Sequence, residues 1–98
     1  MTRRISLSVN DNPIEIDYFV QGFIDHTMAG IVSSLEGINE ISDIKIEISG
    51  SVSRLSVNGD SVPLNDFTDS IISSTVMGMV SSLKGVERSD KIEIIVQR

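Results

Sequence analysis

The sequence predicts an α+β fold with two helices packed on one face of a mainly antiparallel sheet of about six strands. Three observations predict it. The two halves of the chain repeat each other 48 residues apart, short segments alternate between apolar and polar residues, and each half has a longer segment with apolar residues at helical spacing. An internal duplication of a β-β-α-β unit also predicts pseudo-two-fold symmetry.

The repeat needs no gap. Residues 5–48 align with residues 53–96, and fifteen of the 44 aligned pairs are identical, where ordinary residue frequencies give roughly three. The matches include Phe19 with Phe67. Shared low complexity does not explain such matches, so we interpret the halves as copies of one unit.

The chain length allows one domain. Its 98 residues and 10.7 kDa leave no room for a second independent core. We expect a single domain over residues 1–98, whose two repeats cover about 3–49 and 51–98. Because 40 % of the residues are hydrophobic but only 4 % are aromatic, the core is expected to consist of aliphatic side chains and methionine.

Each unit is expected to begin with a hairpin, because two short alternating segments flank a cluster of turn residues. In the second unit two loops keep the apolar residues on one face. A four-residue loop opposes Val57 to Val62, whereas a two-residue loop, Asn58 and Gly59, opposes Val57 to Asp60. We expect the longer loop, because it pairs apolar with apolar residues.

Helices are expected over residues 18–36 and 66–84. Asp17 and Asn65 precede them directly, and both residue types are favoured at the N-cap because the side chain accepts a hydrogen bond from a free backbone N–H. A glycine follows each segment, as is typical of a helix end.

One broad apolar face of each helix is expected to be buried against the sheet, because its apolar residues fall on two adjacent rows of helical spacing. These residues are Phe19, Val20, Phe23, Ile24, Thr27, Met28, Ile31, Val32 and Leu35, and in the second copy Phe67, Ile71, Ile72, Thr75, Val76, Met79, Val80 and Leu83.

A third strand is expected in each unit at 44–48 and 92–96, where apolar and other residues alternate. The simplest order places this strand beside the first strand of its own unit. The short link between the halves leaves a second arrangement open, in which the two third strands are exchanged. The other face of the sheet carries mainly polar residues and is expected to be solvated.

Charge and composition exclude several function classes. Fourteen acidic and eight basic residues give a net charge of −6 and an isoelectric point near 4.5, which opposes binding to nucleic acids and to anionic membranes. The chain has no cysteine. Because it begins without the apolar run of a signal peptide, we expect a cytoplasmic protein.

No catalytic or cofactor motif is apparent. The sequence has neither a phosphate-binding loop nor a dinucleotide fingerprint. Its single histidine, His26, follows Asp25 but has no second histidine or cysteine to complete a site. We therefore expect no catalytic residue, no metal site and no cofactor.

A possible interaction face lies on a helical row that carries small residues and methionine where lysine and glutamate are usual. We expect a homodimer, or docking onto a larger protein, at Ala29, Ser33, Ser73 and Met77. A neighbouring row of small residues includes a mid-helix glycine in each helix, which costs about 1 kcal/mol relative to alanine. The alternative interpretation is that these glycines let the two helices approach each other closely.

Four segments of the second half form a recognisable pattern: Val57-Asn58-Gly59, Val62-Pro63-Leu64-Asn65-Asp66-Phe67, Gly78-Met79-Val80-Ser81-Ser82-Leu83-Lys84-Gly85-Val86 and Ile92-Glu93-Ile94. In this pattern the second half resembles the C-terminal extension of some archaeal and clostridial versions of molybdopterin-guanine dinucleotide biosynthesis protein B. The resemblance implies an accessory or docking module that acts near molybdenum-cofactor handling. The activity of that family resides in a phosphate-binding-loop GTPase domain, which this chain lacks, so no nucleotide-binding residue carries over.

The sequence therefore predicts a non-enzymatic protein-interaction module, and the resemblance implies that it is accessory to molybdenum-cofactor biosynthesis. The alternative prediction is a small-ligand-binding domain with a pocket between the helices and the sheet.

Overall fold

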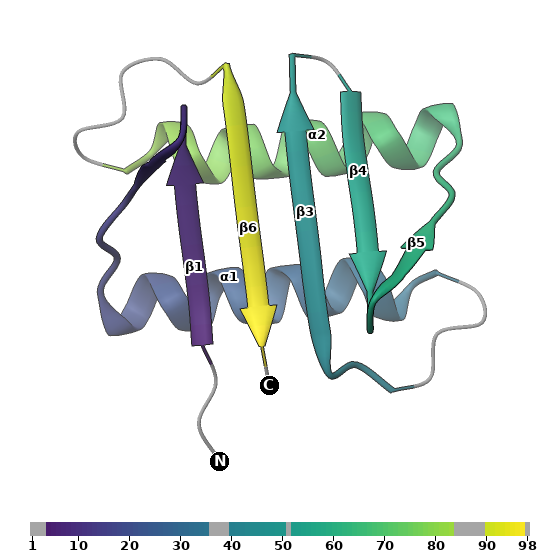
Figure 1. Ribbon diagram of the computed structural model, residues 1–98, viewed down its shortest axis with the longest axis horizontal. Helices are drawn as coiled ribbons and strands as arrows, with labels where there is room; N and C mark the ends of the chain where they lie inside the picture. Colours follow the sequence, from purple (N-terminus) through teal and green to yellow (C-terminus); the bar gives the residue numbers. More distant parts are fainter. Residues whose placement is uncertain (1–3, 36–39, 51, 84–89, 98) are drawn as a thin grey trace.

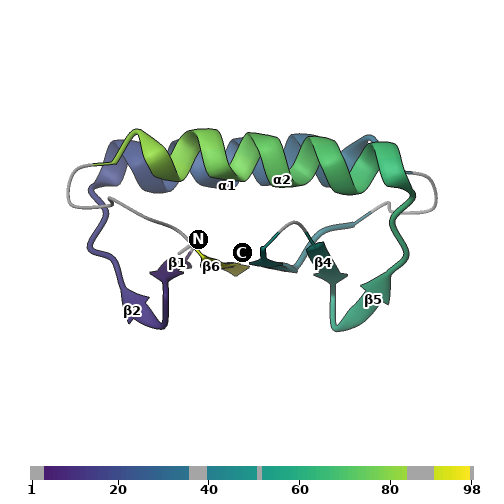
Figure 2. The same ribbon diagram turned by 90° about the horizontal axis from the view of Figure 1, so that it is seen from above.

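Two helices cover one face of a six-stranded antiparallel sheet and leave the other face open (Figures 1 and 2). The computed structural model describes residues 4–35, 40–50, 52–83 and 90–97. The elements in chain order are β1 (Arg4–Val9), β2 (Asn12–Pro13), α1 (Tyr18–Ser33), β3 (Asp43–Ser49), β4 (Val52–Val57), β5 (Asp60–Val62), α2 (Asp66–Ser81) and β6 (Lys91–Gln97).

The expected α+β fold is confirmed, and the exchanged arrangement of the third strands is the one found. The strand order is β2-β1-β6-β3-β4-β5, so β3 pairs with β4 and β6, and β6 pairs with β1 and β3. The simpler order, with each third strand beside the first strand of its own unit, is wrong. The reason is local: Ser49 opposes Val52, and Gly50 adopts a φ of 61° that lets the chain turn directly from β3 into β4.

Corresponding elements of the two halves begin 48 residues apart. Helix α2 begins at Asp66 and α1 at Tyr18, while β6 begins at Lys91 and β3 at Asp43. This is the spacing that the sequence repeat predicts. The duplication itself stays a prediction.

The expected four-residue hairpin loop is wrong, because β4 and β5 are joined by Asn58 and Gly59 alone. Val57 opposes Asp60, which is the pairing that the sequence disfavoured. Both loop residues have a positive φ, 54° and 85°, as the two-residue turn that matches strand twist requires. Turn geometry therefore outweighs the apolar pairing of Val57 with Val62.

The side chain of Asn58 also holds the start of β3. Its Oδ1 accepts hydrogen bonds from the backbone N–H of Ser42 and Asp43, at 2.7 and 3.2 Å, and its Nδ2 donates to the carbonyl oxygen of Glu40 at 2.7 Å. Asn10, in the turn between β1 and β2, accepts in the same way from two N–H groups at the start of β6. Each hairpin turn thus fixes the start of a strand that is distant in sequence.

Both helices begin at the expected residues. Asp17 Oδ1 accepts from the N–H of Val20 at 2.8 Å, and Asn65 Oδ1 accepts from the N–H of Thr68 at 2.8 Å. These N-caps satisfy donors that have no partner within the helix.

Both helices end three residues before the expected position, at Ser33 and Ser81. The hydroxyl of the following Ser34 donates to the carbonyl oxygen four residues earlier, at 2.9 Å, and such side-chain bonds compete with continuation of the helix. The glycines expected to end the helices, Gly37 and Gly85, lie outside the described residues.

The core lies between the helices and the sheet face that they cover. Aliphatic residues from both layers fill it, as the composition predicts. The buried apolar residues are Leu7, Val9, Ile24, Met28, Val32, Ile44, Ile46, Ile48, Leu55, Val57, Ile72, Val76, Val80, Ile92, Ile94 and Val96.

Candidate interaction surface

Only part of the expected apolar face of each helix is buried. Met28 and Val76 are fully buried in the core, but Phe19, Phe23 and Phe67 are 75 %, 51 % and 73 % exposed. The prediction that both apolar rows are buried is therefore wrong. A helix lying on a sheet buries the row that faces the sheet, and a second row needs another covering element. In Figure 2 the helices form the outermost layer on their side.

Apart from Tyr18 and Asp66, the first residue of each helix, the exposed helix residues form a nearly uncharged surface, which we name the outer helix face. All of its members except His26 are apolar residues, glycine or serine. It consists of Phe19, Phe23, His26, Gly30 and Ser33 in α1, and of Phe67, Ser70, Ile71, Ser74, Gly78 and Ser81 in α2.

The glycines of this surface do not bring the two helices together. Gly30 and Gly78 are exposed, and a Cβ atom added to either would meet no heavy atom within 4 Å. The interpretation that they permit close approach of α1 and α2 is therefore wrong. Each mid-helix glycine costs about 1 kcal/mol relative to alanine. Packing among the described residues offers nothing that offsets this cost.

A pocket of about 420 Å³ opens between the helices. The helices run in opposite directions (Figure 1), so the first half of α1 lies beside the end of α2. Phe19 and Phe23, whose ring centroids are 6.3 Å apart, line one side. Met79 and Leu83 line the other side, and β6 contributes Ile94. This lining is almost entirely apolar.

The four residues expected to form the interaction face are placed differently from one another. Ser33 is exposed and belongs to the outer helix face, whereas Ala29 and Ser73 are half-buried and Met77 packs against the core. The row that contains Ala29 also contains Asp25, which is only 3 % exposed. The row is therefore turned partly toward the sheet.

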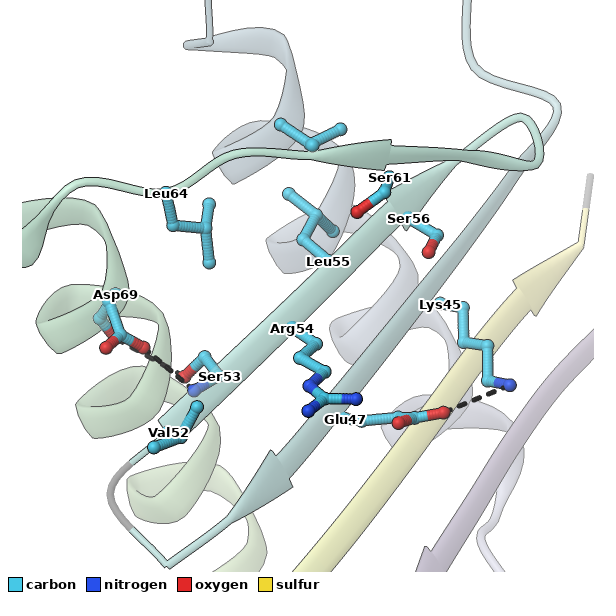
Figure 3. A pocket seen from close by; sticks show the side chains of 11 residues that line it. Lys45, Glu47, Val52, Ser53, Arg54, Leu55, Ser56, Ser61, Leu64 and Asp69 are labelled. Atoms are coloured by element: carbon cyan, nitrogen blue, oxygen red, sulfur yellow. Dashed lines mark hydrogen bonds and ion pairs between the residues drawn. The ribbon is translucent and has the colours of Figure 1, made fainter.

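A second hollow, of about 520 Å³, lies beside β4, β5 and the start of α2 (Figure 3). Strand β5 pairs with β4 only from Leu55 to Val57, so within the described part of the chain the outer edge of β4 has no strand partner before Leu55. Asp69 Oδ1 accepts the N–H of Ser53 at 2.9 Å. This carboxylate takes the place of a strand partner, and its role is structural.

The charged side chains of the open sheet face neutralise one another in part. Lys45 Nζ lies 3.1 Å from Glu47 Oε1. The hydrogen bond and charge of Glu47, together with the charge of Glu93, raise the pKa of Lys45 above its ordinary value. This lysine therefore stays protonated at neutral pH and is unsuited to act as a base.

Among the described residues, no three histidine, cysteine or acidic side chains gather where they could hold a metal ion. His26 is exposed and lines a shallow hollow with Tyr18 and Phe19. Within the same described part of the chain, neither helix is long and apolar enough to cross a membrane.

The sequence could have indicated the outer helix face through its charges alone. From Phe19 to Ser33 the only charged or titratable residues are Asp25 and His26, and α2 has none after Asp69. An amphipathic helix with a solvated outer face normally carries many charges. The scarcity of charge therefore points to an unusual face, but the expectation that the aromatic residues lie in the core hides which face it is.

None of the protein-family models, curated proteins or solved structures compared with this chain matches it. The resemblance to the molybdopterin-guanine dinucleotide biosynthesis family is thus neither supported nor excluded.

Proposed function

We propose that this protein is a non-enzymatic interaction module that binds another protein through the outer helix face. The observation that carries the proposal is the exposure of Phe19, Phe23, Phe67 and Ile71 on adjacent helices of one surface. Phe19 and Phe23 lie at one end of the helix layer and Phe67 and Ile71 at the other, and large exposed apolar side chains gathered on one face commonly mark protein-protein contacts.

The glycines and serines of the same surface support the proposal. Small side chains let another backbone approach a helix closely, and Gly30 and Gly78 serve no such purpose inside the chain. Their cost in helix stability is accounted for if a partner packs against them. Aromatic anchors beside shallow positions are also a common composition of protein interfaces.

The open sheet face is a weaker candidate. Its polar and charged side chains, including Lys45, Glu47 and Arg54, remain hydrated without a partner, and Lys45 is already paired. For exposed phenylalanine rings, in contrast, any contact that removes them from water lowers the free energy. A role beside molybdenum-cofactor enzymes stays a prediction that rests on the sequence resemblance alone.

Site-specific photo-crosslinking in the native cell tests the proposal. We expect p-benzoylphenylalanine at position 23 to give discrete protein adducts on illumination. Val52 is the control position, because it is exposed to a similar degree, 56 % against 51 % for Phe23, but lies in β4. Adducts of equal yield at both positions, or none at position 23, would contradict the proposal.

The pocket between the helices favours one second candidate, the binding of a small apolar ligand. Its volume of about 420 Å³ and its apolar lining suit a short acyl chain. A chain that stays monomeric, gives no adduct at position 23 and binds decanoate in a calorimetric titration would favour this function over the first.

A further inference from the structure

We infer that the partner of the outer helix face is a second copy of this chain, bound helix layer to helix layer in a two-fold symmetric dimer. The inference rests on the proposed function and specifies its partner. Charge, shape and available area each support it.

Charge favours self-association on this face in particular. The chain has a net charge of −6, so two copies repel each other wherever acidic residues meet. Between Phe19 and Ser33, and between Phe67 and Ser81, the exposed residues carry no acidic or strongly basic group, and His26 is the only titratable one. Asp66 and Asp69 lie at the start of α2 beside this stretch, so two identical copies meet on the outer helix face with few like charges opposed.

The shape of the face is complementary to itself. Each helix carries large exposed residues near its start, Phe19 and Phe23 or Phe67 and Ile71, and small ones toward its end. Because α1 and α2 run in opposite directions (Figure 1), the aromatic start of α1 lies beside the glycine-and-serine end of α2.

A two-fold axis that lies in the interface, parallel to the helices, uses this arrangement. It places the aromatic start of α1 in one copy over the glycine-and-serine end of α2 in the other, and the reverse contact follows by symmetry. Large side chains then meet small ones, and the pocket between the helices faces the aromatic residues of the second copy. Gly78 is the position at which a larger residue would obstruct this contact.

The outline of the molecule leaves room for a stable dimer interface. The molecule measures 37 × 34 Å across the direction of view of Figure 1, an outline of about 1,260 Å², whereas stable interfaces bury about 800 Å² per partner. An interface over the helices and the pocket between them fits within this outline.

Sedimentation equilibrium of the purified full chain between about 1 and 500 µM tests the inference. We expect the mass to approach twice 10.7 kDa within this range. Ser74→Asp, which adds one negative charge to the middle of the outer helix face, is expected to weaken the dimer at least tenfold. Ser6→Asp adds the same charge to an exposed position of β1 and is expected to change the dissociation constant less than twofold.

A further pair of variants removes bulk in place of adding charge. Phe67→Ser is expected to weaken the dimer at least tenfold, and Val52→Ser, at a comparably exposed position of β4, less than twofold. All four positions are exposed, so circular dichroism should show folded variants.

Three results would overturn the inference: a monomer at every concentration, a dimer that tolerates Ser74→Asp and Phe67→Ser, or a dimer weakened equally by Ser6→Asp. A monomeric chain that still gives adducts of other proteins at position 23 would remove the self-partner and leave the proposed function standing. A monomeric chain that gives no adducts at position 23 would contradict both the self-partner and the proposed function.

Discussion

Cut between Gly50 and Ser51, the chain is expected to yield two halves, neither of which folds as a monomer. In the first half β3 pairs only with β4 and β6, which both belong to the second half. Strand β1 keeps only the short β2 as a partner within its half. Each half therefore lacks the neighbours that complete its part of the sheet.

The expected loss of folded structure is large, because the intact link holds each half near the other at an effective concentration on the order of millimolar. At about 10 µM each half alone should give the circular dichroism of an unfolded chain or sediment as an oligomer. An equimolar mixture should recover the spectrum of the intact protein. A half that is folded and monomeric by sedimentation would contradict the exchanged strand order, because it would have to pair its own first and third strands.

Met28→Ala is expected to destabilise the protein by about 2–5 kcal/mol, the usual cost of truncating a buried methionine. Met28 is 0 % exposed on the row of α1 that faces the sheet, so the truncation leaves a cavity. Phe67→Ala removes a larger side chain, but Phe67 is 73 % exposed. Its expected cost to the monomer is below about 1 kcal/mol.

Urea unfolding at low protein concentration measures both values without a contribution from self-association. At high concentration, dimer formation stabilises the folded wild type. The difference in unfolding free energy between the wild type and Phe67→Ala should therefore be larger than at low concentration. A loss of 2 kcal/mol or more for Phe67→Ala at low concentration would mean that this ring is part of the core. It would remove the main evidence for the outer helix face.

Local signals in the sequence predicted the elements well. Alternation indicates β1, β3, β4 and β6, but not β2, which covers only Asn12–Pro13, while the alternating Ile14 and Ile16 that follow are in no strand. The polar residues at positions 17 and 65 indicate both helix starts, because an N-cap acts through contacts within three residues. The layer order followed from the apolar spacing, since each helix must bury one face against the sheet.

Choices that depend on three-dimensional context were less predictable. The apolar pairing of Val57 with Val62 favoured a longer loop, yet the positive φ values of Asn58 and Gly59 determine a two-residue turn. The strand exchange likewise follows from the turn at Gly50. The alternation of apolar and polar residues in the flanking strands predicts the strands but not this turn.

The candidate site was the least predictable part. An apolar residue on a helix has the same sequence pattern whether it packs against its own sheet or lies exposed on the surface. The sequence pattern therefore places both Phe19 and Met28 in the core. The structure separates them, because Phe19 is 75 % exposed and Met28 is buried. The uncharged character of the helices indicates an unusual face, but the residue pattern alone places it on the row through Ala29 and Met77, and the structure places the exposed residues elsewhere.

Isotope-filtered nuclear Overhauser spectroscopy on an equimolar mixture of labelled and unlabelled chains, at millimolar concentration, tests the outer helix face most directly. Contact between copies through this face predicts intermolecular cross-peaks from the rings of Phe19 and Phe67 to the glycine and serine protons of the helix ends. Cross-peaks confined to open-sheet residues such as Ser6 and Arg54, or no intermolecular cross-peaks, would contradict it.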